Sequence, residues 1–311
     1  MKEELKNEHV VTIKDFTVAE LDTIFDLADE MIPVAEGEKK NDDLYGKLLA
    51  TLFYEPSTRT RLSFEGAMKR MGGRCIGFAK PGTSSAKKGE TLADTIRVAS
   101  GYADLIVLRH HREGAARLAS KFSDVPVINA GDGAGHHPTQ TLLDLFTIRE
   151  EKGEISDNHI GIAGDLKYGR TVHSLTHALS MYDTELTFIS PPSLRMPEEI
   201  LKGLNGISYH EVDTIEETLE DLDVLYMTRI QRERFPSSKD YEEVARSYHI
   251  EKKMLDKIDT KSDLTILHPL PRVDEITADV DPTPYAKYFR QAANGIPVRM
   301  ALLKLLMEGK K

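Results

Sequence analysis

Residues 48–61 read LLATLFYEPSTRTR, an apolar run typical of a buried strand followed at once by alternating hydroxyl and guanidinium side chains. Apolar residues then recur through 64–71 at the i, i+3, i+4, i+7 spacing of an amphipathic helix. The polar turn Ser57 to Arg61 therefore opens a helix, where backbone N–H groups lack partners and the helix dipole is positive. This junction predicts a phosphate-binding turn. A helix cap with solvated arginines explains it equally well.

The alternation of apolar strands and periodic helices continues on both sides of this junction. It predicts two doubly wound α/β domains, each a parallel sheet flanked by helices, with the active site in the cleft between them. The first set of strands is expected at 48–54, 74–78, 105–108 and 125–129, with helices at 59–71, 91–100 and 114–122. The second set of strands is expected at 159–163, 186–189, 207–210, 224–227 and 264–267.

The domain boundary is expected near a long helix at 139–151, which a polar break follows. An apolar last helix at 296–307 is expected to pack back on the first domain. The predicted domains are therefore 1–138 with 293–311, and 139–292. Before 48, Thr17 and Glu20 form a capping-box pattern that opens a further helix.

The composition of the 311 residues limits the classes of partner. A net charge of −10 argues against a nucleic acid or an anionic membrane as partner. No apolar run approaches the roughly 20 residues that span a bilayer, so a soluble, cytoplasmic protein is expected. The single cysteine, Cys75, lies in an apolar stretch and is expected to be a buried thiol rather than a nucleophile.

Unusual polar residues follow several of the expected strands. Ligands of open parallel sheets bind beyond the carboxyl ends of the strands. There the chain places Arg109, and after a glycine-rich loop at 130–135 it places His137 and Gln140 at the opening of a helix. Together with the turn at 57–61, these residues predict one anion site, although each alone is more simply a surface or structural residue.

The second half carries a similar pattern. Arg170 opens a helix after the glycine-containing segment 164–170, and Arg229 follows the strand at 224–227, so the two guanidinium groups suit a dicarboxylate. Pairing with local acids explains them equally well. Segment 164–170 also resembles the entry to a dinucleotide fold, but the G-x-G-x-x-G spacing is missing. The prolines of segment 268–272 leave carbonyl oxygens that could accept from an amide, or form an ordinary turn.

The stretch 82–90 is small and polar and is expected to be a mobile loop. Lys88 is there either a solvated charge or a cation brought to an anionic site when the loop closes.

Seven segments together resemble the catalytic chain of aspartate carbamoyltransferase, in the aspartate/ornithine carbamoyltransferase superfamily. The resemblance covers nearly the whole chain. Pro269 is typically cysteine in the ornithine enzymes, so the aspartate enzyme is favoured. The sequence departs from the expected motif at His111, where proline usually stands, and at His136. The matching segments are 57–61, 87–90, 109–110, 137–140, 165–173, 228–231 and 268–272.

The resemblance implies transfer of the carbamoyl group of carbamoyl phosphate to the α-amine of L-aspartate, a step of pyrimidine (UMP) biosynthesis, without a metal or cofactor. It implies that Arg59, Thr60, Lys88, Arg109 and His137 are catalytic. It further implies that carbamoyl phosphate binds to Ser57, Thr58, Arg59, Thr60, Arg109, His137, Gln140, Pro269, Leu270 and Pro271, and aspartate to Lys88, Arg170, Arg229 and Gln231.

The resemblance also implies a cytoplasmic, allosteric homotrimer in which Ser84 and Lys88 enter the neighbouring active site. Whether a separate regulatory chain joins the trimers stays open. The alternatives are a non-catalytic carbamoyl phosphate sensor, a carbamoyltransferase with another amine acceptor such as ornithine, and a dinucleotide-dependent oxidoreductase. Closure of the domains would involve loops 82–90 and 229–246.

Overall fold

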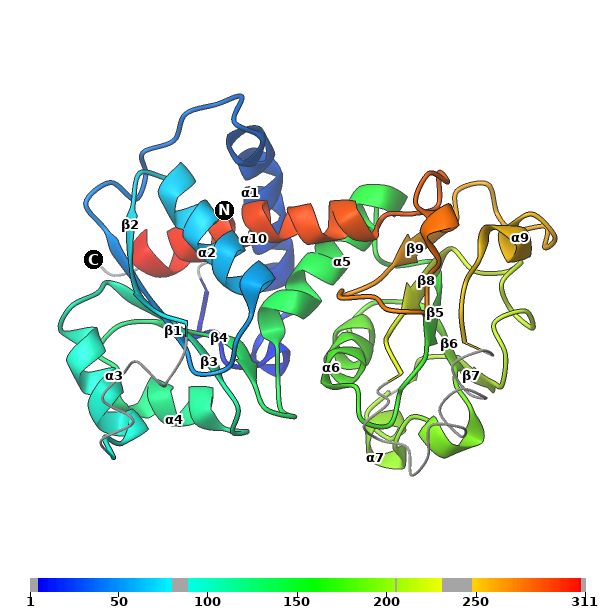
Figure 1. The fold of residues 1–311 in the computed structure, drawn as a ribbon, viewed down its shortest axis with the longest axis horizontal. Coiled ribbons are helices and arrows are strands. Elements are labelled where there is room, and N and C mark those ends of the chain that lie inside the picture. Colours follow the sequence, from blue (N-terminus) through cyan, green and yellow to red (C-terminus); the bar gives the residue numbers. More distant parts are fainter. Residues whose placement is uncertain (1–4, 80–88, 205, 231–247, 309–311) are drawn as a thin grey trace. The chain divides into compact units, whose positions relative to one another are not determined.

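The computed structural model describes residues 5–79, 89–204, 206–230 and 248–308, and Figure 1 shows its secondary structure. The chain divides into two compact units, Met1–Leu143 with Asn294–Lys311, and Asp144–Ala293. The predicted boundaries stand at 138/139 and 292/293, whereas the chain changes unit within α5 (Pro138–Lys152) and within α10 (Tyr288–Glu308).

Unit 1 is built on a four-stranded parallel sheet with the order β2-β1-β3-β4. Helices α1 and α2 cover one face, and α3 and α4 lie together on the other (Figure 1). Right-handed crossovers produce this arrangement, because the chain moves outward from β1 to β2 and then returns past β1 to β3. The elements are α1 Val18–Glu36, β1 Leu48–Phe53, α2 Thr58–Arg70, β2 Arg74–Phe78, α3 Leu92–Ser100, β3 Leu105–His110, α4 Ala115–Phe122 and β4 Val127–Asp132.

Unit 2 holds a five-stranded parallel sheet with the order β7-β6-β5-β8-β9. Strand β8 is buried at every position, as expected for a central parallel strand covered on both faces. The elements are β5 His159–Ala163, α6 Arg170–Leu179, β6 Glu185–Ile189, α7 Glu198–Leu201, β7 Tyr209–Val212, β8 Val224–Met227, α9 Lys252–Leu255 and β9 Thr265–Leu267. Two parallel sheets flanked by helices confirm the predicted fold class.

The start of α1 confirms the predicted capping box. The Thr17 hydroxyl accepts from the Glu20 N–H at 3.3 Å, and the Glu20 carboxylate accepts from the Thr17 N–H at 2.9 Å. These two bonds satisfy N–H groups that a bare helix end leaves open. Among the described residues, no helix is both long and apolar enough to cross a membrane.

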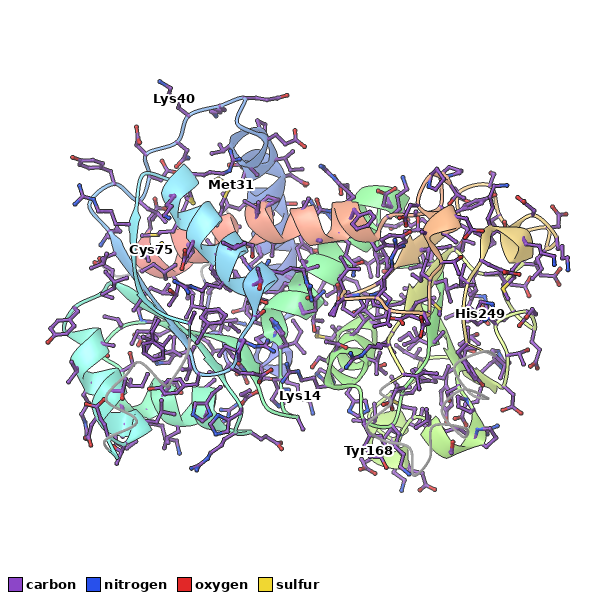
Figure 2. All side chains as sticks on the ribbon, in the orientation of Figure 1. Lys14, Met31, Lys40, Cys75, Tyr168 and His249 are labelled. Carbon is purple, nitrogen blue, oxygen red and sulfur yellow. The ribbon has the colours of Figure 1, made fainter. Side chains whose placement is uncertain are left out.

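Four sequence predictions need correction. Helix α10 begins at Tyr288 instead of 296, and Pro297 lies inside it although proline is typical of a first turn. Strand β7 lies at 209–212 instead of 207–210, and β4 lies at 127–132 instead of 125–129, which takes it into the predicted loop 130–135. Cys75 is only half-buried, because β2 is an edge strand (Figure 2). Burial nevertheless raises the pKa of the Cys75 thiol to about 11, which keeps it protonated at neutral pH and unsuited to be a nucleophile.

Candidate active site

The turn at Ser57 begins α2 without a side-chain cap. Ser57 occupies the N-cap position with extended backbone, φ −153° and ψ 105°, and its hydroxyl makes no capping hydrogen bond. Thr60, in the first turn, is buried at 8% exposure, while Arg59 is exposed. The capping explanation of this turn is therefore not realised, and its hydroxyl and N–H donors remain together at the positive end of a helix of 13 residues.

Arg109, on β3, lies at the neighbouring strand end and is held by two acceptors. One terminal nitrogen donates to the Ala130 carbonyl at 3.0 Å, and the other donates to the Glu55 carboxylate at 2.6 Å. The buried Nε of Arg109 has no hydrogen-bond partner among the described residues. A buried guanidinium N–H without an acceptor is costly, and an anionic ligand is one way to satisfy it.

Arg59 and Arg109 are close enough to repel each other. Partial desolvation, followed by the charge of Arg109, lowers the pKa of the Arg59 guanidinium from its usual value, although Arg59 stays charged at neutral pH. Glu55 is the carboxylate that partly compensates this positive charge. The site thus favours a ligand with at least one negative charge.

His137 and Gln140 lie at the beginning of α5, after the neighbouring strand β4. His137 is buried at 6% exposure and immediately precedes the helix, and its carbonyl accepts from the Gln140 N–H at 3.0 Å. The His137 ring lies 3.4 Å from the Thr139 hydroxyl through Nδ1. As predicted, the imidazole is at a helix opening at the carboxyl edge of the sheet.

A buried carboxylate connects the loops that carry Arg109 and His137. Asp132, at 2% exposure, accepts from the Gly114 N–H at 2.9 Å, the His136 N–H at 2.7 Å and the Asn129 side-chain amide at 3.1 Å. The Gly133 N–H also donates to the His110 carbonyl at 2.8 Å. The two loops are therefore fixed to each other.

The predicted anion-binding residues of unit 1 occupy the switch point of its sheet. The chain leaves β1 toward β2 on one side, whereas β3 and β4 follow on the other side. The turn at 57–61 follows β1, and Arg109 lies on β3, the strand paired with β1 through Phe53↔Arg109. In open α/β sheets this crevice is where ligands bind.

Unit 2 repeats this arrangement. Its switch point lies between β5 and β8, with β6 and β7 on one side and β9 on the other. Arg170 is the first residue of α6 and follows β5, while Arg229 follows β8. The Thr228 N–H donates to the Ala163 carbonyl at 2.8 Å, so the two segments leave adjacent strand ends. Gly164, with φ +120°, passes so close to Thr228 that a Cβ would stand 2.3 Å from its carbonyl oxygen.

The segment predicted to offer carbonyl oxygens follows β9, the next strand of the same sheet. Pro269 and Leu270 are half-buried and Pro271 is exposed. Leu270 has φ 52°, a left-handed conformation uncommon for a bulky residue. In the described part of the chain, the carbonyl oxygens of Pro269 and Leu270 accept no hydrogen bond. Ser84, Lys88 and Gln231 lie outside the described residues.

The two histidines that depart from the expected sequence motif, His111 and His136, have different surroundings. His111 is exposed and stacks on His110, with ring centroids 4.3 Å apart. His136 is half-buried, and its Nδ1 lies 3.3 Å from the Thr12 hydroxyl. Burial lowers the pKa of His136, with Asp132 opposing that shift. Neither histidine replaces a predicted ligand.

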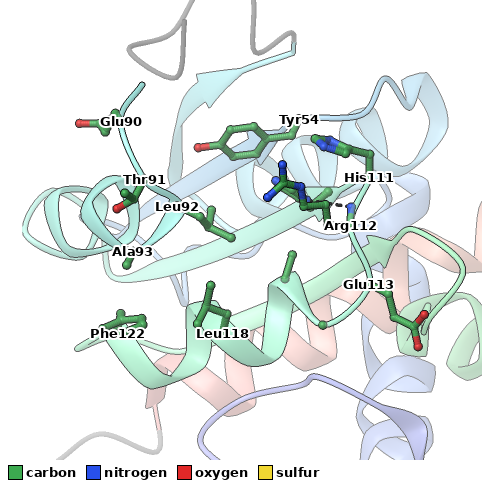
Figure 3. Close-up of a pocket in the computed structure, with 13 residues that line it drawn as sticks. Tyr54, Glu90, Thr91, Leu92, Ala93, His111, Arg112, Glu113, Leu118 and Phe122 are labelled. Carbon is green, nitrogen blue, oxygen red and sulfur yellow. Dashed lines mark hydrogen bonds between the residues drawn. The ribbon is translucent and has the colours of Figure 1, made fainter. Parts of the chain in front are cut away.

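A cavity of about 620 Å³ lies beside the same end of the unit 1 sheet (Figure 3). Tyr54 and Arg112 come from the ends of β1 and β3, and Leu118 and Phe122 of α4 line the opposite wall (Figure 3). No predicted carbamoyl phosphate residue lines it. The cavity and the predicted anion site are thus different places.

Both units match one protein family. Residues 8–150 match its "carbamoyl-P binding domain" and residues 156–306 its "Asp/Orn binding domain". This chain belongs to the aspartate/ornithine carbamoyltransferase family. The match spans both switch points, so the resemblance seen in the sequence motifs is confirmed.

Carbamoyltransferases of this family include close relatives of the chain. The aspartate carbamoyltransferase catalytic subunit of Methanothrix thermoacetophila is 56% identical over 306 residues, 98% of this chain and 99% of the relative. The catalytic subunit of M. jannaschii aspartate transcarbamoylase has a TM-score of 0.93 at 53% identity, covering 98% of this chain and 99% of that one. A Trypanosoma cruzi aspartate transcarbamoylase in complex with carbamoyl phosphate and aspartate has a TM-score of 0.89 at 36% identity, covering 96% and 95%.

The sequence motifs do not include the residues that hold the predicted ligand-binding side chains in place. Glu55 stands beside the first motif, Asn129 and Asp132 lie in an expected strand and a glycine-rich loop, and Glu275 lies beyond the last motif. The available signal was a polar residue in an otherwise apolar strand end, since buried polar groups require partners.

Proposed function

We propose that this chain is the catalytic subunit of an aspartate carbamoyltransferase, which transfers the carbamoyl group of carbamoyl phosphate to the α-amine of L-aspartate and releases phosphate. The main support is that each sheet carries a pair of arginines at its switch point, Arg59 with Arg109 and Arg170 with Arg229. A dianionic phosphate and a dicarboxylate are the ligands that such pairs suit. Relatives named for this activity, at 56% and 55% identity, support it further.

In the proposed reaction, the neutral amine of aspartate attacks the carbonyl carbon of carbamoyl phosphate. The C–O bond to phosphate then breaks, and the phosphate leaves with the bonding electron pair. Arg109, His137 and Thr60 stabilise the developing oxyanion, and Arg59 with the first turn of α2 neutralises the leaving phosphate. The departing phosphate takes the amine proton, so no protein general base is required.

The remaining predicted residues bind and orient the substrates. Ser57, Thr58, Gln140 and Pro271 contact carbamoyl phosphate, and the carbonyl oxygens of Pro269 and Leu270 accept from its NH₂. Arg170 and Arg229 hold the two carboxylates of aspartate together with Gln231. Fixing both substrates within attack distance lowers the barrier by removing translational freedom before the reaction.

The proposal includes a homotrimer in which Ser84 and Lys88 complete the neighbour's site. Exposed apolar side chains on unit 1 support a subunit contact, since Leu62 and Tyr102 are 62% and 68% exposed. A cytoplasmic location, a place in pyrimidine biosynthesis and allosteric control through a regulatory chain remain predictions of the resemblance. Native mass measurement of the purified chain, alone and with candidate partners, tests the assembly.

One assay tests the reaction itself. Carbamoyl aspartate formation is measured from carbamoyl phosphate and aspartate, with ornithine as the control amine. We expect product when aspartate is the amine and no product when ornithine is the amine. Product with ornithine instead would assign a different acceptor, and binding of carbamoyl phosphate without product from either amine would favour a sensor.

A further inference from the structure

A pair of buried side chains fixes the backbone of the segment after β9. His268 and Glu275 are 2% and 6% exposed. The Nε2 of His268 lies 2.8 Å from Oε1 of Glu275, and its Nδ1 lies 2.8 Å from the backbone nitrogen of Leu270. The imidazole thus bridges a carboxylate and the residue that follows Pro269.

These contacts determine which ring nitrogen carries the proton. A backbone N–H can only donate, so Nδ1 of His268 must be the unprotonated acceptor for Leu270. Nε2 then carries the hydrogen and donates to Glu275. In the opposite tautomer, two N–H donors would point at each other between His268 and Leu270.

Glu275 is itself held so that it can only accept. Its second oxygen, Oε2, accepts from the N–H groups of Val273 and Asp274, both at 3.1 Å. Burial by itself raises the pKa of Glu275, but the hydrogen bond from His268 and backbone N–H donors, among them that of Val273, outweigh burial and lower it. An ionised carboxylate with donors on both oxygens locks the His268 tautomer.

The main chain of His268 is fixed from the other side. Its N–H donates to Oε1 of Gln291 at 2.8 Å, and the Gln291 amide donates to Asp144 at 2.6 Å. The Tyr226 hydroxyl donates to the other oxygen of Asp144 at 3.0 Å. All five side chains belong to unit 2, so the network is complete within one compact body.

The network uses the Leu270 N–H but leaves neighbouring carbonyls without a donor. Leu270 has φ 52°, and within the described ranges the carbonyl oxygens of Pro269 and Leu270 accept no hydrogen bond. A carbonyl in this position is an acceptor with both lone pairs available. It is complementary to an NH₂ group and not to a methyl group of the same size.

We propose that His268 and Glu275 are positioning residues, which hold Leu270 through one imidazole tautomer and so aim the Pro269 and Leu270 carbonyls at the substrate NH₂. The inference deepens the proposed carbamoyl transfer and rests on it. According to this proposal, the preference of the site for a carbamoyl phosphate over an acyl phosphate depends on two side chains, His268 and Glu275, that do not touch the substrate.

The direct test uses two isosteric ligands, phosphonoacetamide and acetonylphosphonate, which differ only in NH₂ against CH₃. Their dissociation constants are measured by calorimetry for the wild-type protein and for Glu275→Gln. In this variant the glutamine oxygen takes the two backbone donors and its NH₂ faces Nε2, which forces the wrong tautomer. The wild-type protein is expected to prefer the amide at least about tenfold, the effect of one discriminating hydrogen bond. The variant is expected to lose most of that preference while binding acetonylphosphonate within about twofold of wild type.

Two histidine variants separate positioning from general packing. In His268→Asn, an oxygen takes the place of Nδ1 and can still accept from Leu270. In His268→Gln, the amide reaches Glu275 but leaves Leu270 without an acceptor. The asparagine variant is therefore expected to retain more of the amide preference than the glutamine variant, whereas loss of packing alone predicts no such order. Glu185→Gln, at the exposed His210–Glu185 pair separated by 3.4 Å, is the matched control.

The wild-type protein also gives a test that no folding defect can obscure. Nitrogen NMR of ¹⁵N-histidine-labelled protein at neutral pH is expected to show His268 with an unprotonated Nδ1. A protonated Nδ1, or a Glu275→Gln variant that keeps the full amide preference, would overturn the proposal. The product assay on the wild-type protein tests carbamoyl transfer separately, so the proposed reaction and the positioning role of His268 and Glu275 can each fail without the other.

Discussion

Glu55 and Arg109 form an ion pair of 2.6 Å at the switch point of the unit 1 sheet, joining residues 54 positions apart. Arg109 is mostly buried, and Arg59 nearby adds a second positive charge that no carboxylate of the described chain pairs directly. Glu55 therefore occupies part of the electrostatic role that a phosphate would take when it binds. The Glu55 carboxylate therefore competes with an anionic ligand for Arg109.

Removing the charge of Glu55 is expected to strengthen anion binding. In Glu55→Gln, Arg109 loses its carboxylate partner, so inorganic phosphate no longer competes with a carboxylate for Arg109. We expect the dissociation constant of phosphate, measured by calorimetry, to fall about 5- to 10-fold, or roughly 1 kcal/mol for a partly exposed pair. Glu65→Gln is the control, because Glu65 pairs with Arg61 at 2.6 Å. Unchanged or weaker phosphate binding in Glu55→Gln would contradict this interpretation.

Arg59 and Arg61 offer a matched comparison on one helix turn. Arg61 pairs with Glu65, whereas Arg59 lies beside Arg109 and makes no ion pair with a described residue. Arg59→Ala is expected to lower kcat by about 100-fold or more, the cost of losing a preorganised charge donor in the transition state. Arg61→Ala should keep most activity. The thermal unfolding midpoint should be unchanged in Arg59→Ala, since its side chain is exposed.

Arg229 is expected to determine the use of aspartate. Arg229→Ala removes one charged donor to a carboxylate, which costs about 2 kcal/mol, or roughly a 30-fold loss in kcat/KM for aspartate. Binding of carbamoyl phosphate should change little. Arg195→Ala, which breaks surface ion pairs with Asp213 and Glu211, is the control. Aspartate kinetics that stay at the wild-type level in Arg229→Ala would remove Arg229 from the substrate site.

The strand-by-strand alternation predicted both sheets because burial on two faces leaves a clear apolar signal. It did not show which strands lie at the edges. Ile76 belongs to an apolar run yet is 41% exposed, because β2 has only one neighbour. The last helix begins at Tyr288 rather than at 296 and contains Pro297 in its interior, because tertiary packing overrides the preference of proline for a first turn.

At the candidate site, the sequence predicted which polar residues stand at the ends of neighbouring strands, as at Arg59 and Arg109. Its supporting contacts were not, because they depend on distances through space. Asp132 accepts from Gly114, 18 positions away, and Glu275 acts through the ring of His268 on Leu270. The carboxylate positions carry no periodicity or motif that indicates such partners.

His110 predicts how acid affects unit 1. Burial, then the charges of His111 and Arg112, lowers the pKa of His110 to about 4, against 6.5 as its usual value. The unfolded chain therefore binds the extra proton first, and stability is lost as the pH falls from about 6.5 toward 4. Between pH 6.5 and 5, wild type is expected to lose about 2 kcal/mol that His110→Asn does not lose. Urea unfolding of both proteins at the two pH values measures this, and equal losses would contradict it.

Asp132 is expected to couple the Arg109 and His137 loops through its charge. In Asp132→Asn, the new NH₂ must face either the Gly114 N–H or the His136 N–H, which now bond the two carboxylate oxygens at 2.9 and 2.7 Å. A buried donor facing a donor costs about 1–3 kcal/mol. We expect lower thermal stability and a weaker affinity for carbamoyl phosphate, with the KM for aspartate nearly unchanged. Asp104→Asn is the control, because the Asp104 carboxylate on the same unit also accepts from a backbone N–H, that of Leu48 at 2.8 Å, and pairs with Lys47. If stability falls but carbamoyl phosphate binding does not, Asp132 supports the fold without positioning the site.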